Sequence, residues 1–447
     1  MVLFSEYPSP RLSFVVQFLQ YIVGRDIFVT NSPTDFLSFS GCKINYSNQH
    51  FGESVYTILP NQLIFSSEIS PVETHVGECR GNICLFTNHH CQHGFDIMAG
   101  IFYLLSRYEE YLPHQKDMYG RFSHTESIAY KYHFLHLPLV NFWIKDFIFQ
   151  LTQFCSQYSI RSPFQEKQKT KATSPSSFFI PTYDIDIAYS YLHQPTIKNI
   201  AGIVKNIIKT NFDSVRERVN VLSGKKTDPF DCFEWLQQLH QQYQLDPIYF
   251  FLVAEMRGQY DKNLSPSNPA MQRLIKEHAS KYQVGLHPSW HSGDDSSYLS
   301  KEKKQFEQIT HQSCYRSRQH YIRLTLPDTY TTLINNGIFE DYSMGYGSIN
   351  GFRASVASPF NWFNLQENAA THLELHPFCF MDANANFEQH LTPNEAAKEL
   401  QYYHDIVKQI DGRLMTIFHN HFMTTQPQWA AWRQLYADFL ANNFVLK

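Results

Sequence analysis

The chain of 447 residues lacks several features that would have assigned it to a broad class. It has no block of Lys and Arg and its formal net charge is −4, which argues against nucleic acid as a partner. No apolar run reaches the roughly 20 residues that a transmembrane helix needs. The 8 cysteines form no CxxC pair, and no internal repeat is visible. What is present, 43% hydrophobic and 17% charged residues, is the composition of a globular protein with a large core.

The first residues do not resemble a secretory signal. Glu6 comes early, two prolines interrupt the segment, and no basic stretch precedes an apolar run. Residues 12–23 instead have the pattern of an amphipathic or buried helix. We therefore expect a cytoplasmic protein.

A polar stretch divides the chain. Residues 161–177 are rich in Lys, Gln, Ser and Pro, have no apolar periodicity, and are predicted to be a linker. Residues 1–160 are expected to form a smaller α+β domain of unknown role. Its strand-like runs lie at 54–60 and 61–67, and its clearest helical segment at 95–112.

Residues 178–447 have the pattern of an α/β domain. Short apolar runs alternate with longer helical segments, as in βα units that form a parallel sheet. The insert at 196–224 is also mostly helical. The seven candidate strands are residues 178–184, 248–254, 283–287, 313–318, 338–343, 371–376 and 414–419.

Polar residues recur where these candidate strands end. In a (β/α) barrel the carboxyl ends of the strands open on one face, where active sites are built. The pattern therefore predicts an active site made from several strand ends. The residues concerned are Asp184, Asp186, His287, Arg318, His320, Asp341, His376 and His419.

Two of these positions carry carboxylates in the order Tyr183-Asp184-Ile185-Asp186. Side chains two apart on a strand point the same way unless the chain turns at the strand end. One Asp can then bind a metal while the other faces the substrate. The same spacing is found in sugar-nucleotide transferases and in solvated loops.

Two histidines frame the end of the third candidate strand. His287 is followed by Pro288, which suits the first position of a helix. A helix that began there would place His291 one turn on, on the same side as His287. With Asp186 these side chains would form an open set of metal ligands, for which Zn²⁺ is the natural choice and other divalent ions are possible.

Further candidates follow from residue type and place. Arg318 is expected to orient a catalytic carboxylate and keep it ionised. His419 suits a general acid because its ordinary pKa lies near neutrality. The predicted substrate-binding residues are Trp290, Tyr321, Asp341, Arg353 and His376, the first two by stacking on a sugar ring, and Asp382 is a candidate for the same role or for supporting the site.

The order of these motifs resembles the polysaccharide deacetylase family, also called the NodB-homology domain or carbohydrate esterase family four. The resemblance covers roughly residues 175–440. The family motif Thr-Phe-Asp-Asp-Gly corresponds to Thr182-Tyr183-Asp184 with Asp186, His-(Ser/Thr)-x-x-His to His287 through His291, Arg-x-Pro-Tyr to Arg318 through Tyr321, and Leu-x-His to the stretch ending at His419.

The resemblance implies a distorted (β/α)7 barrel and a set of roles. Asp184 would be the general base, and Arg318 would tether it. Asp186, His287 and His291 would hold the metal, and His419 would be the general acid.

Three residues depart from the family pattern. Ile185 separates the two aspartates, so either could be the base, Pro288 replaces a hydroxyl residue, and His320 replaces a proline. This variant looks like a bacterial subgroup that carries its own N-terminal domain.

The sequence thus predicts a metal-dependent hydrolase that removes N-acetyl groups from a sugar or polysaccharide and releases acetate. A catalytically inactive carbohydrate-binding barrel, an amidase acting on a non-sugar amide and a nucleotide-sugar transferase remain alternatives. The last of these does not explain His287 and His291.

Overall fold

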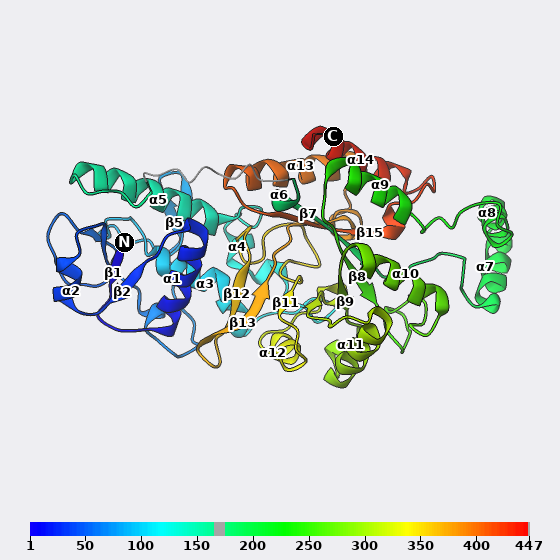
Figure 1. Cartoon of the computed structure of the whole chain (residues 1–447), viewed down its shortest axis with the longest axis horizontal. Coiled ribbons are helices and arrows are strands. Elements are labelled where there is room, and N and C mark those ends of the chain that lie inside the picture. Colours follow the sequence, from blue (N-terminus) through cyan, green and yellow to red (C-terminus); the bar gives the residue numbers. More distant parts are fainter. Residues whose placement is uncertain (165–174, 446–447) are drawn as a thin grey trace.

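The computed structural model describes residues 1–164 and 175–445. Most of the predicted linker, residues 165–174, therefore lies outside the described residues. Figure 1 shows an N-terminal region at one end of an elongated molecule, a large sheet with surrounding helices at the centre, and a pair of helices at the other end. No helix among the described residues has the length and apolar character to span a bilayer.

The N-terminal region is built on a small parallel sheet of four strands in the order β2-β1-β3-β4, with a separate antiparallel hairpin β5-β6. Its strands are β1 (Val2–Phe4), β2 (Phe28–Thr30), β3 (Lys43–Asn45), β4 (Tyr56–Thr57), β5 (Gly77–Cys79) and β6 (Asn82–Cys84). Its helices are α1 (Pro10–Val23), α2 (Pro33–Ser38), α3 (Ile97–Leu105), α4 (Ile128–Lys131) and α5 (Leu139–Gln157), with 3₁₀ turns η1 (Gln62–Ile64), η2 (Tyr108–Tyr111) and η3 (His124–Glu126).

Side-chain caps in the N-terminal region explain why one predicted element is present and another is not. The helix predicted at 12–23 is confirmed as α1, because the Ser9 side chain accepts from two backbone N–H groups at its start and Gly24 ends it in the left-handed conformation. The strand predicted at 61–67 is wrong. There the Asn61 side chain accepts from the backbone N–H of Leu63, which starts the 3₁₀ turn η1.

The central sheet has nine strands in the order β12-β13-β11-β10-β9-β8-β7-β15-β14, and every pair except β12-β13 is parallel. The strands are β7 (Phe179–Ile185), β8 (Ile248–Leu252), β9 (Gln283–His287), β10 (Arg316–Ser317), β11 (Glu340–Asp341), β12 (Phe360–Asn364), β13 (Ala369–Leu375), β14 (Phe380–Met381) and β15 (Leu414–His419). Each of the seven predicted strands overlaps one of them, and the mixed α/β class with a parallel-rich sheet is confirmed. Within the described residues no pairing joins β12 to β14, so the sheet is open there.

Helices follow most of these strands, as βα units require. They are α6 (Pro175–Phe178), α7 (Thr196–Ile208), α8 (Phe212–Leu222), α9 (Phe233–Tyr243), α10 (Pro269–Lys281), α11 (Ser296–Thr310), α12 (Asp328–Asn335), α13 (Pro393–Gln409) and α14 (Ala430–Asn443), with short turns η4 (His291–Gly293), η5 (His320–Ile322), η6 (Asn384–Glu388) and η7 (Asn420–Phe422). The insert between β7 and β8 is helical as predicted.

The strand register brings the predicted site residues to one edge of the sheet. His419 on β15 pairs with Asp184 on β7, and His287 on β9 pairs with the last residue of β8. The backbone N–H of Arg318, just after β10, donates to Leu286 of β9. Four of five neighbouring parallel strands, β15, β7, β9 and β10, therefore carry polar side chains at or just after their carboxyl ends, where the sequence pattern predicts a site.

The N-terminal region packs directly against the central sheet. Rings of α1 and α3 contact β12, since Phe14 and Phe102 lie 5.2 and 5.1 Å from Phe363. These residues belong to one hydrophobic core cluster that includes buried side chains on both sides of residue 165. The division into domains at 1–160 and 178–447 remains a prediction.

Candidate active site

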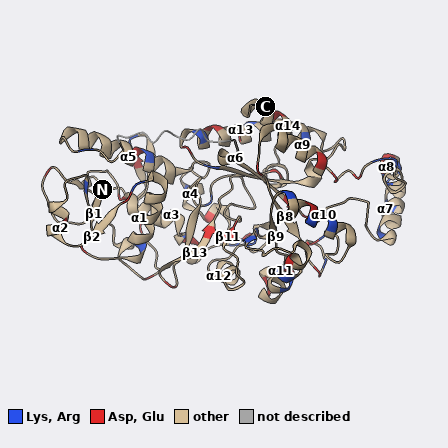
Figure 2. Cartoon of the chain, viewed as in Figure 1, with Lys and Arg blue, Asp and Glu red and all other residues tan. Residues whose placement is uncertain are grey.

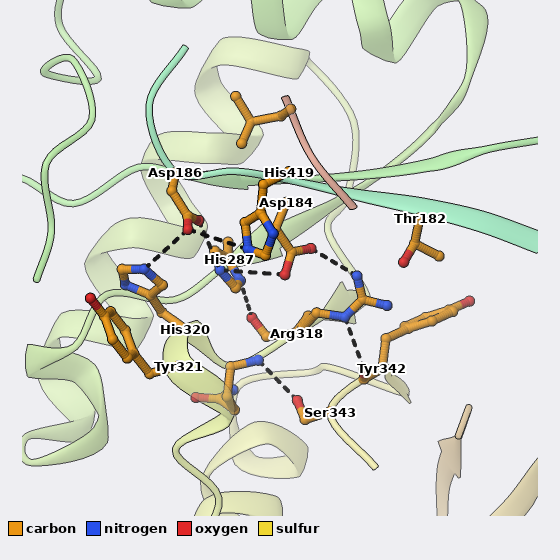
Figure 3. Close-up of polar contacts among 12 residues, drawn as sticks. Thr182, Asp184, Asp186, His287, Arg318, His320, Tyr321, Tyr342, Ser343 and His419 are labelled. Carbon is orange, nitrogen blue, oxygen red and sulfur yellow. Dashed lines mark hydrogen bonds and ion pairs between the residues drawn. The ribbon is translucent and has the colours of Figure 1, made fainter. Parts of the chain in front are cut away.

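Two histidines and a carboxylate converge at the ends of β7, β9 and β10 (Figure 3). The Nε2 atom of His287 lies 3.2 Å from Oδ1 of Asp186, and Nε2 of His320 lies 3.6 Å from Oδ2 of the same residue. One ligand atom from each residue lies within 4.8 Å of the other two. The group is therefore compact enough for all three side chains to reach one cation.

The hydrogen bonds behind the two imidazoles fix which nitrogen faces inward. Nδ1 of His287 donates to the backbone carbonyl of Arg318 at 2.6 Å, and Nδ1 of His320 donates to Asp261 at 2.9 Å. Each Nε2 is then left to face Asp186, as in metal sites where an acceptor holds the far nitrogen of the ligand. Oδ1 of Asp186 is buried and accepts no hydrogen bond from the described residues. These donors fit a divalent cation.

The charges in this group support one another. Burial alone would raise the pKa of Asp186, but His320, His287 and His419 outweigh it and hold that pKa well below its ordinary value. Burial alone would lower the pKa of His320, but Asp186 and Asp261 raise it to about 9. The surroundings of Asp186 thus favour a positive charge, which either a proton on a histidine or a bound metal ion can supply.

The second carboxylate, Asp184, is held by Arg318, the arginine that the sequence analysis placed beside a carboxylate. Nη1 of Arg318 donates to Oδ1 of Asp184 at 2.7 Å, and Nε donates to the carbonyl of Tyr342 at 2.9 Å. Both side chains are buried, and the Arg318 guanidinium lies 4.4 Å from the ring centre of Phe250. Oδ2 of Asp184 is left 3.7 Å from Nε2 of His287. Asp184 therefore lies beside the His–Asp group with its orientation fixed.

His419 completes the group from the far side. Its Nε2 lies 3.6 Å from Oδ2 of Asp186, and its Nδ1 donates to Asp382 at 2.6 Å. Burial would lower the pKa of His419, but Asp382, Asp186 and Asp184 raise it to about 10. The imidazole is thus oriented and positively charged at neutral pH. Asp382, a candidate for a supporting role, occupies one.

His291 does not belong to this group, and His320 takes the place predicted for it. Pro288 and Ser289 are not helical, and the 3₁₀ turn η4 begins only at His291. The expected helical turn between His287 and His291 is therefore absent. Partly exposed His291 instead has its ring 6.0 Å from that of Tyr298.

A cavity of about 480 Å³ opens beside these residues. It is lined by Asp184, Asp186, His287, His320, Tyr321 and His419 together with Tyr260, Lys262, Phe387, Glu388 and other residues. Two lining residues, Tyr119 and Arg121, come from the N-terminal region. No sequence pattern indicated these two residues, because only the packing of the two regions brings together residues some 200 positions apart.

Arg121 ties the N-terminal region to the rim of the cavity. Its Nη1 donates to the backbone carbonyls of Tyr321 and Gly347, both at 2.9 Å. A Cβ atom at Gly347 would lie 2.1 Å from that nitrogen, so the close approach requires glycine. Tyr321 has a φ of 57° and the next residue, Ile322, one of 54°. Arg121 thus braces a backbone segment in a conformation that non-glycine residues rarely adopt.

Four aromatic rings form a wall at this rim. Tyr260 stacks on Trp290 with ring centres 3.9 Å apart and planes 18° apart, and the Tyr119 ring lies 5.3 Å from that of Tyr321. Trp290 was predicted to contact substrate, but of the four rings it is the one that does not line the cavity. Tyr321, also predicted to contact substrate, does line the cavity, and its contact with substrate stays a prediction.

Asp341, His376 and Arg353 were also predicted to bind substrate, but none of them lines the cavity. The first two are buried within the sheet region. Asp341 is fully buried and accepts hydrogen bonds from the backbone and side chain of Ser343. His376 is buried and stacks on Tyr342, with ring centres 4.3 Å apart. Their side chains thus support the sheet ends from behind.

Arg353 has a structural partner in the N-terminal region. It is 1% exposed and pairs with Glu110 through two hydrogen bonds of 2.8 and 2.5 Å. Glu110 also accepts from Arg107 at 2.7 Å. Arg353 and Arg107 lower the pKa of Glu110 to about 2 although burial would raise it. This ion-pair group joins the two regions and leaves no donor of Arg353 in the cavity.

Comparison with known proteins finds one family model that is similar to part of the chain. Residues 1–156 match a family of unknown function, DUF7033. No curated protein matches the sequence. Among solved structures, similarity is found to one assigned as a polysaccharide deacetylase from Mycobacterium smegmatis, with 12% identity, a TM-score of 0.36, and coverage of 59% of this chain and 85% of the other.

A CE4 family pseudoenzyme from Bacillus anthracis is also similar, with 8% identity and a TM-score of 0.30 over 61% of this chain and 63% of the other. A mutant of it with restored enzymatic activity has 10% identity and a TM-score of 0.27, over 60% of this chain and 64% of the other. The match thus spans under two thirds of these two proteins. Such low values assign no function to this chain.

Proposed function

We propose that this chain is a metal-dependent hydrolase that removes N-acetyl groups from a sugar or polysaccharide and releases acetate. The observation that carries the proposal is the convergence of Asp186, His287 and His320 beside an oriented carboxylate, Asp184, and a charged imidazole, His419. These are the parts that hydrolysis of an amide needs: a cation site, a base and an acid. The order of the sequence motifs supports the same reading, and we interpret the sheet as a distorted barrel that is open between β12 and β14.

The metal would be held by Asp186, His287 and His320. Two imidazoles and one carboxylate suit Zn²⁺ and leave positions for water and substrate, although the same set accepts other divalent ions. When bound, the ion supplies Lewis-acid polarisation of the amide carbonyl and makes a bound water more acidic.

Asp184 is the better candidate for the general base. Its carboxylate is fixed by Arg318 and keeps one oxygen, Oδ2, beside the cation group, whereas both oxygens of Asp186 face histidines. Asp184 would take the proton of the attacking water. His419, held in its charged form by Asp382, would give a proton to the departing amine, so that acetate and a free amino sugar leave.

The cavity wall supports a carbohydrate as the substrate. A volume of about 480 Å³ lies within the usual range for small-molecule sites and suits one or two sugar rings. Tyr321 and Tyr119 present aromatic rings at its rim, and such rings combine an apolar face with a hydroxyl group. The N-terminal region would thus contribute directly to substrate binding.

Acetate release tests the proposal. The full chain, loaded with Zn²⁺, should release acetate from N-acetylglucosamine oligomers, and Asp184→Asn should abolish release without a change in folded structure or bound metal. Full activity in the Asp184→Asn protein would contradict the proposal. Oligomer binding without release by the wild-type protein would favour an inactive carbohydrate-binding module, and release from non-sugar amides alone would favour an amidase.

A further inference from the structure

The helices α7 and α8 form a hairpin that projects from the end of the molecule opposite the N-terminal region (Figure 1). The hairpin is anchored at its base, where Arg218 donates to Asn199 at 2.8 Å and Asn199 donates to the carbonyl of Tyr191 at 2.9 Å. The one buried residue of α7 is Asn199 and that of α8 is Val221. The hairpin therefore buries little of its apolar surface, and Val221 is the one apolar side chain of its two helices that is classed as buried.

Those apolar side chains are exposed. Along α7 they recur every three or four residues and so share one face, and α8 repeats the pattern. None of them belongs to a hydrophobic core cluster of the described residues. They are Ile197, Ile200, Val204, Ile207, Ile208, Phe212, Val219 and Leu222, and the most exposed are Ile197 at 78% and Ile208 at 76%. A contiguous apolar face of this kind marks an interaction surface.

The charge of the hairpin indicates what covers that face. Residues 196–226 carry seven Lys and Arg against two Asp and Glu, in a chain whose net charge is −4 (Figure 2). On α7 itself there is no acidic residue, and Lys198 and Lys205 are exposed beside the apolar face. Lysines that flank an apolar helix face can place their ammonium groups among lipid phosphates while the face enters the acyl boundary. A second copy of the hairpin would bring like charges together.

We propose that the α7–α8 hairpin docks this protein on an anionic lipid surface, lying in the interface without crossing the bilayer. Burial of the isoleucine-rich face supplies the apolar part of the binding free energy, and the excess positive charge supplies an attraction that salt weakens. This inference does not depend on the hydrolase activity, because it concerns residues that do not line the cavity.

Vesicle sedimentation of the full chain tests the inference. The wild-type protein should sediment with vesicles of phosphatidylglycerol and phosphatidylcholine, less so at high salt, and much less with phosphatidylcholine alone. The double change Ile200→Asp with Ile208→Asp should weaken binding by at least about tenfold, since both side chains lose their apolar burial. Lys205→Glu with Lys209→Glu should remove most of the preference for anionic lipid.

Matched controls on other surfaces make the outcome specific. Phe149→Asp on α5 changes a side chain that is 58% exposed, and Lys304→Glu reverses an exposed charge on α11. Neither change should alter vesicle binding. Failure of the wild-type protein to bind anionic vesicles would overturn the proposal, as would equal losses in the controls. A dimer in solution that Ile200→Asp with Ile208→Asp dissociates, without lipid binding by the wild type, would show that a second copy covers the face.

Discussion

His419 donates two hydrogen bonds to the carboxylate of Asp382, one from its imidazole and one from its backbone. Nδ1 of His419 donates to Oδ1 of Asp382 at 2.6 Å, and the backbone N–H of His419 donates to Oδ2 at 2.7 Å. Asp382 is fully buried and His419 ends strand β15, so both groups are held by the sheet. The remaining nitrogen, Nε2, points to the cavity and lies 3.6 Å from Asp186. Asp382 is thus a positioning residue for His419.

Asp382→Asn should therefore lower acetate release by about 100-fold or more, because the imidazole loses both its fixed orientation and its stabilised charge. Removal of the carboxylate lowers the pKa of His419. A general acid works only while it is protonated, so the activity that remains should decline at a lower pH than in the wild type. The pH profile of kcat measures this, and the metal content should not change.

A similar pair outside the cavity provides the control. Asp405 lies 2.8 Å from His404 on α13, and Asp405→Asn should leave both the rate and the pH profile unchanged. Equal pH profiles for the wild-type and Asp382→Asn proteins would show that Asp382 does not act through His419.

His320 and His291 should differ sharply in their effect on metal binding. His320→Gln removes one of three grouped ligands and should weaken Zn²⁺ binding by more than about 100-fold, since even the loss of an outer partner costs 10- to 100-fold. His291→Gln should bind Zn²⁺ like the wild type. Titration of the metal-free proteins with Zn²⁺ measures both affinities. The opposite result would restore the assignment that the sequence motif had given to His291.

The strands of the central sheet were predictable because buried strands consist mostly of apolar residues. Every residue of β8 and β15 is buried, so each reads as a continuous apolar run. The polar residues that close such runs, among them Asp184, His287 and His419, were predictable for the same reason. Parallel pairing then brings them to one edge without further information.

What the sequence did not predict depends on local geometry and on long-range packing. His291 was expected at a helical distance from His287, but Pro288 and Ser289 are not helical, and a histidine from the next strand end, His320, lies in the group instead. Arg353 looked like a site residue near glycines, yet its partner, Glu110, is 243 residues away in the chain. A single sequence has no signal for such a pair, nor for the arrival of Tyr119 at the cavity.

Tyr119→Ala tests the contribution of the N-terminal region to substrate binding. The ring lines the cavity beside Tyr321, and its loss should raise KM for N-acetylglucosamine oligomers about fivefold, a cost of about 1 kcal/mol, with little change in kcat. The neighbouring Met118 is 87% exposed, and Met118→Ala should leave both constants unchanged. An unchanged KM in Tyr119→Ala would mean that substrate does not reach this wall.

Arg353→Met should cost stability rather than substrate affinity. The change leaves Glu110 buried with Arg107 as its remaining partner, and breaking a buried ion pair costs about 3–5 kcal/mol. Urea unfolding should show the loss as a lower midpoint, whereas KM of the folded protein should stay at the wild-type value. Arg323→Met, at a partly exposed ion pair with Asp294, is the control and should shift the midpoint much less. A raised KM in Arg353→Met without lower stability would return Arg353 to the substrate site.

Buried histidines away from the cavity should make the fold sensitive to acid. Burial lowers the pKa of His240 to about 3, where its Nε2 lies 2.8 Å from the hydroxyl of Tyr183. In the unfolded chain the same group has its ordinary pKa of about 6.5. Below pH 6.5 the unfolded state therefore binds a proton that the native state does not, and the free energy of unfolding falls by up to about 1.4 kcal/mol per pH unit until pH 3. Burial also lowers the pKa of His93 to about 3 and that of His278 to about 4, and these groups add to the slope.

Unfolding in urea between pH 7.5 and pH 5 measures that slope. The His240→Gln protein cannot take up this proton, so its free energy of unfolding should fall less steeply over this range than that of the wild type. Its free energy of unfolding at pH 7.5 can be lower, because the contact with Tyr183 changes, but only the slope is compared. His50→Gln alters an exposed histidine and should keep the wild-type slope. Parallel pH dependence in the His240→Gln and wild-type proteins would show that His240 is protonated in the native state or accessible to water there, contrary to its burial.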